Sequence, residues 1–196
     1  SMNQIKNIVE ALLLSSGEPL SADRIHKIIN SKEVCTKADI LEAINTLKID
    51  YEKKEIEIST VASGYRIQAK STINDFLNII YADKTPRYSR ALMETLSIIA
   101  YKQPVTRGDI ESIRGVSVSS SIMRTLTDRN WIKIVGYRDV PGKPAMFSTT
   151  NEFLDYFGLE KLSQLPDLPD IKEPKNLSLD LELSNESDLP QPKELN

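Results

Sequence analysis

The stretch that decides the fold is residues 92–110, LMETLSIIAYKQPVTRGDI. Its apolar residues share one helical face: Leu92, Met93, Leu96 and Ile99. Pro104 ends this helix, because proline has no amide hydrogen for the backbone ladder. Thr106 is a suitable cap for a second helix, and Asp109 three residues later favours a helix N-terminus. Two helices joined by a short proline turn begin a helix-turn-helix.

The rest of a winged helix surrounds this stretch, and the same order of elements occurs earlier in the chain. Residues 5–51 contain three helical patterns, and the period then changes to two on either side of a turn at Ser63-Gly64. After a third helix near residue 122, two strands at 131–137 and 145–149 flank Pro141-Gly142. The sequence therefore predicts a mainly α protein with small β-hairpin wings (α+β), built as two tandem winged-helix domains.

Charge and proline content set the predicted boundaries. We expect an N-terminal domain at 3–82, a C-terminal domain at 87–160 and a tail at 165–196. Residues 86–165 hold 11 basic and 8 acidic side chains, whereas residues 166–196 hold 3 and 8. Because this tail is acidic, proline-containing and free of aromatic residues, its composition is that of a disordered segment. Within it, 177–183 reads LSLDLEL, whose strict alternation also suits a strand added to the edge of a wing.

The first helix carries more apolar surface than one face accommodates. The run Leu12, Leu13 and Leu14 spreads over several sides of a helix, because successive residues differ by about 100°. We interpret these three leucines as a homodimer interface. The alternative is that a linker helix at residues 73–81 covers them within one chain.

Catalytic and cofactor chemistry finds no support in the sequence. The single histidine, His26, has no partner cluster, and the single cysteine, Cys35, excludes an internal disulfide. No zinc-ligand spacing, glycine-rich phosphate loop or membrane-spanning apolar run is present. We therefore expect no enzyme activity, no metal, no cofactor and no membrane association.

DNA binding is the serious alternative, because winged helices often enter the major groove. The third helices begin with TKAD and SSS, which offer few of the Arg, Lys, Asn and Gln side chains that read base edges. Seven arginines of the second module leave weak phosphate contact possible: Arg87, Arg90, Arg107, Arg114, Arg124, Arg129 and Arg138. A winged-helix DNA-binding transcriptional regulator therefore stays open as the second interpretation.

Four sequence blocks resemble the segregation and condensation protein B family. They are ETLSIIAYKQPVTR at 94–107, IRGV at 113–116, VGYRDVPGKP at 135–144 and EFLDYFGL at 152–159. The resemblance covers about residues 3–166 and leaves the tail unmatched. At Asn130-Trp131 the sequence departs from the family's usual glycine and aliphatic residue, which we interpret as a local packing change.

The resemblance implies a non-catalytic subunit of the bacterial SMC–kleisin condensin, acting in chromosome condensation and partition during cell division. It also implies a homodimer that binds the kleisin ScpA and, through it, SMC. Contact with DNA is then weak or indirect, and the location is the cytoplasm, associated with the nucleoid. Since aromatic and arginine side chains dominate interface energies, we expect the kleisin to contact the second module. The candidate anchors on or beside the family blocks are Tyr101, Arg107, Arg114, Tyr137 and Met146.

Overall fold

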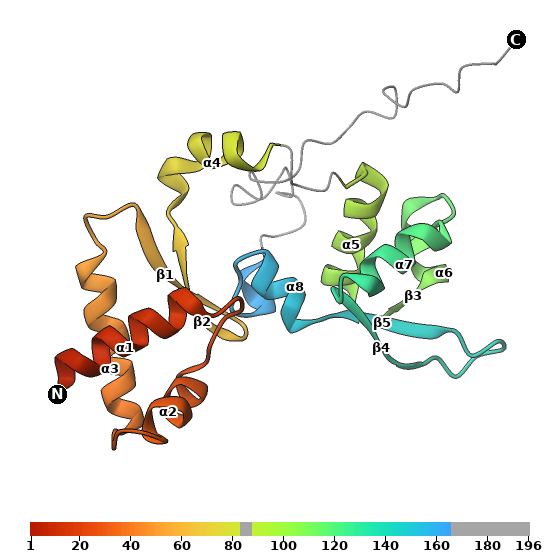
Figure 1. Ribbon diagram of the computed structural model, residues 1–196. Helices are drawn as coiled ribbons and strands as arrows, with labels where there is room; N and C mark the ends of the chain where they lie inside the picture. The colour runs from red at the N-terminus through yellow and green to blue at the C-terminus, as the bar shows by residue number, and fades with distance from the viewer. Residues whose placement is uncertain (83–87, 166–196) are drawn as a thin grey trace, which may run out of the picture. The chain divides into compact units, whose positions relative to one another are not determined.

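A computed structural model describes residues 1–82 and 88–165, so the linker at 83–87 and the LSLDLEL segment lie outside the described residues. The chain forms two compact units (Figure 1). The first unit consists of Ser1–Ile79 and, in the described part, the returning residues 150–165. The described part of the second unit lies between residues 80 and 149. Both units are mainly helical with a small antiparallel sheet, which confirms the predicted fold class.

The first unit contains three helices, a hairpin, a linker helix and a returning helix. In chain order these are α1 (Met2–Ser15), α2 (Ala22–Asn30), α3 (Lys37–Asp50), β1 (Ile56–Val61), β2 (Gly64–Ala69), α4 (Asn74–Tyr81) and α8 (Asn151–Tyr156). Residue 79, at which the two compact units divide, falls inside α4. Ser21 caps α2, and Thr36 and Asp39 form a reciprocal capping box at α3. The predicted order of three helices and a wing is therefore confirmed.

The core of the first unit lies between α1, α2, α3 and the hairpin. Its fully buried side chains come from the predicted helical faces: Val9, Ile25, Ile40, Ile44 and Leu47. Ile58 of β1 also belongs to this core, as does Tyr51 at the end of α3. The Tyr51 hydroxyl donates a hydrogen bond to Glu10 of α1. Burial raises the pKa of this phenol, and the bonded carboxylate raises it further.

A glycine fixes the crossing of the first wing over the loop before α2. Gly64 has φ +137°, and a Cβ built on it would lie 2.4 Å from the carbonyl carbon and oxygen of Leu20. Two backbone hydrogen bonds hold this crossing, from Leu20 N to Tyr65 O (2.9 Å) and from Tyr65 N to Leu20 O (2.8 Å). The wing therefore joins the helices through main-chain atoms at a point that only glycine permits.

The second unit repeats the helix–helix–helix–wing order. Its elements are α5 (Arg90–Lys102), β3 (Val105–Thr106), α6 (Arg107–Arg114), α7 (Ser120–Asp128), β4 (Ile132–Tyr137) and β5 (Ala145–Thr149). The sheet has the order β3-β5-β4, with a register shift between Ile134 and Gly136. Thr106 caps α6 as predicted, and the structure adds a reciprocal capping box with Asp109. Gly142 has a positive φ in the wing turn. The short strand β3 was not predicted from the sequence.

The core of the second unit is lined by helical faces and the base of the wing. Ile99, Ile110, Val118 and Leu126 are completely buried. Tyr88 and Trp131 pack edge to face, with ring centroids 5.3 Å apart. The Arg129 guanidinium lies 5.0 Å from the Tyr88 ring centre and 5.8 Å from that of Trp131. Trp131, at the departure from the family pattern, is thus a packed core residue.

The returning residues 150–165 contact the first wing. Asp155 of α8 is buried and accepts hydrogen bonds from the backbone N (2.8 Å) and the Oγ of Ser63 in the β1–β2 turn. The backbone N of Ala62 donates to the carbonyl oxygen of Leu159 at 3.0 Å. The sequence-based boundary at residue 160 placed α8 in the second module, whereas these contacts group it with the first unit.

Candidate interaction surfaces

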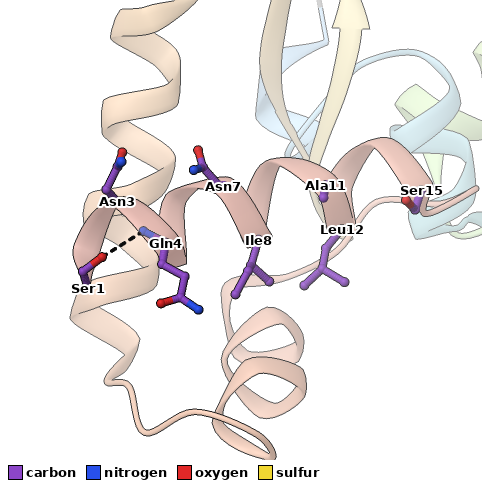
Figure 2. A pocket seen from close by; sticks show the side chains of 8 residues that line it. All are labelled: Ser1, Asn3, Gln4, Asn7, Ile8, Ala11, Leu12 and Ser15. Carbon is purple, nitrogen blue, oxygen red and sulfur yellow. Dashed lines mark hydrogen bonds between the residues drawn. The ribbon is translucent and has the colours of Figure 1, made fainter.

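One open groove runs along α1 (Figure 2). It is lined by Ser1, Asn3, Gln4, Asn7, Ile8, Ala11, Leu12 and Ser15. Figure 2 shows Ile8 and Leu12 pointing to the same side of the helix, whereas Asn3 and Asn7 point away from them. The adjoining side of α1, with Ile5, Val9 and Leu13, is buried in the core, and Ile8 and Leu12 pack partly against that core. The helix therefore has a second, partly apolar side that the described part of its own unit covers only in part.

The three leucines predicted for a dimer interface occupy different environments. Leu12 is half-buried in the groove, and Leu14 is 64% exposed. Leu13 is only 5% exposed, so its side chain stabilises the core of its own chain. By helical period Leu14 falls in the sector of Asn3 and Asn7, beside the groove. Leu14 is thus the leucine that is mostly free for a partner, whereas Leu12 offers only part of its surface, on a different side of the helix.

The linker helix α4 leaves this surface open. It has no buried residue, and its exposed apolar side chains are Phe76, Ile79, Ile80 and Tyr81. Phe76 is 69% and Ile79 is 77% exposed, so α4 does not bury its apolar side against α1. The alternative that α4 covers the leucines within one chain is therefore not what the structure shows for Leu14. The first unit instead presents two apolar surfaces.

Of the five predicted kleisin anchors, two lie on the second wing. Tyr137 of β4 is 64% exposed, and Met146 of β5 is half-buried. Met146 pairs with Gly136, and its Cε lies 3.3 Å from the position of a Cβ at that glycine. Ile134, Val135 and Val140 extend the exposed apolar surface of the wing around Tyr137. Tyr101 is half-buried on α5, outside the wing.

The two predicted arginine anchors are engaged inside their own unit. The Arg107 guanidinium donates to the carbonyl oxygen of Val118 and to Ser120 Oγ, and it pairs with Glu111 at 3.3 Å. Glu111 in turn accepts a hydrogen bond from Val118 N at 3.1 Å. The Arg114 side chain is 11% exposed, with Nη2 3.4 Å from Glu94 Oε2. Arg107 thus joins the start of α6 to the α6–α7 loop, and Arg114 joins α6 to α5.

Asp109 connects the capping box of α6 to the wing. Its carboxylate accepts a hydrogen bond from Thr106 N (3.0 Å) and pairs in a bidentate manner with Arg138, at 2.7 Å for both nitrogens. Arg138, followed by Thr106, lowers the pKa of Asp109 to about 2. The capping pattern predicted the role of Asp109, but its partner 29 positions away carried no signal in the sequence.

Acid is expected to weaken this connection. The folded pKa of Asp109 lies below its ordinary value of 3.8, so its stabilisation is complete above that value and is lost as the pH falls towards 2. Because the carboxylate is about a third exposed, we expect a contribution of about 1–2 kcal/mol after solvent screening. Urea unfolding of Asp109→Asn and the parent protein at pH 7 and pH 3 measures it. The difference between the two proteins should shrink at pH 3, and an equal difference at both pH values would contradict the assignment.

Most arginines that suggested phosphate binding have contacts within their unit. Arg107, Arg114, Arg129 and Arg138 are engaged as described above, and Arg90 pairs with Glu94 at 2.9 Å. Arg87 lies outside the described residues, and Arg124 is exposed on α7. The described part of the second unit therefore offers fewer arginines for DNA phosphates than the sequence count suggested.

The two residues weighed for catalysis have structural contacts. His26 Nε2 lies 2.9 Å from the carbonyl oxygen of Cys35. Cys35 is buried, and burial followed by Asp39 raises the pKa of its thiol, which disfavours a reactive thiolate. Within residues 1–82 and 88–165, no group of three potential ligands is placed to hold a metal ion. No helix in these ranges has the length and apolar character that a membrane crossing requires.

In comparisons with known proteins, one family matches a stretch that spans both units. A family model described as "Segregation and condensation complex subunit ScpB" matches residues 7–168. A relative named segregation and condensation protein B homolog, from Coxiella burnetii, is 46% identical over 166 residues, covering 85% of this chain and 79% of that protein. The segregation and condensation protein B of Clostridium tetani is 40% identical over 168 residues, covering 85% and 87%. A solved structure of ScpB from Mycobacterium tuberculosis matches with a TM-score of 0.39 and 28% identity, covering 81% of this chain and 98% of that one.

Proposed function

The chain belongs to the family of segregation and condensation complex subunit ScpB, and from this premise we propose that it is a non-catalytic condensin subunit that binds the kleisin ScpA. The observation that carries the proposal is the family match over residues 7–168, which spans both units. Through ScpA the protein joins SMC and acts in chromosome condensation and partition during cell division. The protein is then located in the cytoplasm, where it associates with the nucleoid.

Two separate surfaces support two different contacts. On the first unit, the exposed Leu14, beside an α1 groove that contains Ile8 and Leu12, gives a partly apolar surface for a second copy of the chain. On the second unit, the exposed wing around Tyr137 gives an aromatic anchor with apolar neighbours for the kleisin. The engaged arginines favour this assignment over the alternative of a transcriptional regulator, which needs cationic side chains free for phosphates.

Mass measurement tests the dimer and the kleisin complex together. Light scattering at tens of micromolar is expected to give about 44 kDa, twice the 22.1 kDa of one chain, and ScpA is expected to co-elute with this species. Leu14→Lys places a charge on the dimer surface and should lower the mass without loss of fold, because Leu14 is exposed. Tyr137→Ala should keep the two-chain mass and weaken ScpA binding about tenfold or more.

The outcomes separate the two assignments and the alternative function. A single-chain mass for the unaltered protein would contradict the proposed dimer. Unchanged ScpA affinity in Tyr137→Ala would contradict the proposal that the wing is the kleisin surface. No complex with ScpA, together with a sequence-dependent shift of duplex DNA at moderate salt, would instead support the regulator.

A further inference from the structure

The second wing has a strand edge that no described residue covers. In the sheet order β3-β5-β4, β5 is central and β4 pairs only with β5 among the described residues. Along β4, Ile134 is 52% exposed and Val135 is 49% exposed, and Tyr137 follows them. A long apolar edge with unpaired backbone groups is a template for an added strand, and soluble proteins usually cover or interrupt such an edge.

The other strand edges of the described chain differ from β4. Both residues of β3 are buried. No residue of β1 or β2 is exposed, and the returning residues 150–165 bind the turn between these two strands. Only β4, within the described residues, combines a free edge with exposed apolar side chains.

The chain itself contains a segment of the matching chemistry. We propose that residues 177–183, LSLDLEL, add as a strand to the free edge of β4. The leucines at 177, 179, 181 and 183 would form one apolar side, against the exposed residues of the wing. On the other side lie Ser178, Asp180 and Glu182, which remain in water. Backbone hydrogen bonds supply the affinity in this mode of binding, and the alternating side chains select the face.

Charge and tethering favour this occupant. Lys133 on β4 and Lys143 in the wing loop are exposed, whereas residues 166–196 hold eight acidic and three basic side chains. Leu177 follows Leu165, the last described residue, by 12 positions, and residues 150–165 themselves follow β5 directly. A tether of this length keeps the local concentration of the segment on the order of millimolar, so that even weak strand addition is populated. The register shift near Val135 twists the edge, so pairing shorter than seven residues is expected.

Hydrogen exchange of the full chain tests the proposal. In the double variant Leu179→Ser with Leu181→Ser, the amides of Lys133–Tyr137 should exchange about tenfold faster than in the unaltered protein. The matched control, Ser178→Thr with Ser184→Thr, changes two positions outside the leucine row and should leave the protection unchanged. The amides of α5 serve as an internal reference that all three proteins should share.

A second measurement tests whether the two leucine substitutions change β4 exchange through loss of strand addition or through another effect on the chain. A synthetic peptide of residues 174–186, added to the leucine variant, should restore slow exchange in β4, and a scrambled peptide should not. Equal β4 exchange in all three proteins, or no restoration by the peptide, would overturn the proposal. Higher salt should also speed β4 exchange in the unaltered protein, because the acidic segment lies beside lysines.

Discussion

Replacing Gly64 with alanine is expected to lower the free energy of unfolding of the first unit by about 3–5 kcal/mol. The new Cβ would lie 2.4 Å from the carbonyl group of Leu20 and 2.5 Å from Ser21 N, and all of these are backbone atoms. Relieving the overlap requires the two Leu20–Tyr65 hydrogen bonds to break. The positive φ of +137° adds strain that alanine tolerates poorly. Urea unfolding followed by circular dichroism measures the loss.

The matched control for this change is Gly17→Ala. No heavy atom lies within 4 Å of the Cβ position at Gly17, and its φ is not in the left-handed region. We expect this variant to stay within about 0.5 kcal/mol of the unaltered protein. A Gly64→Ala protein as stable as the Gly17→Ala protein would show that the wing crosses the Leu20 loop differently.

The second large effect is expected at Asp155. Its replacement by alanine removes both acceptors of Ser63 and leaves the backbone N–H of Ser63 in a part-buried place without a partner. A lost acceptor of this kind typically costs about 1–3 kcal/mol, and the Ala62–Leu159 hydrogen bond then loses its support. We therefore expect a loss of about 2–4 kcal/mol and early proteolytic cleavage between residues 150 and 165.

Three variants show whether this loss comes from the hydrogen bonds. Asp155→Asn keeps one acceptor and should be less destabilised than Asp155→Ala. Ser63→Ala removes only the hydroxyl bond and should cost about 1 kcal/mol. Glu160→Ala changes an exposed acid four positions after the last residue of α8 and should be neutral. If Glu160→Ala became as sensitive to protease as Asp155→Ala, the contact with Ser63 would not be the cause.

Local patterns predicted the elements of this fold well, because the physics that sets them is local. Caps act over three residues, so Thr106 with Asp109 marked the start of α6 correctly. The hairpin turn at Ser63-Gly64 followed from the change of period on either side. The strand β3 was missed because two residues do not establish a period.

Side-chain partners were harder to predict, because a pattern shows which face is apolar but not what covers it. Leu13 and Leu14 are neighbours of one type, yet one lies in the core and the other is exposed. Arg107 has the chemistry of an interface anchor, but its nearest acceptor is the carbonyl of Val118. The contact between Ser63 and Asp155 spans 92 positions. The role of Leu14 and Tyr137 at interfaces stays a prediction.

The returning residues 150–165 also determine the order in which the two units can complete their folding during synthesis. The second unit takes its described contacts from one continuous stretch, residues 80–149, and can fold as soon as that stretch has left the ribosome. The first unit is synthesised earlier, but its contacts are completed later. Ser63 can bind Asp155, and Ala62 can bind Leu159, only after translation has passed residue 159. In a nascent chain halted at residue 149, the second unit would therefore be folded, whereas the wing of the first unit would still lack its contacts with residues 150–165.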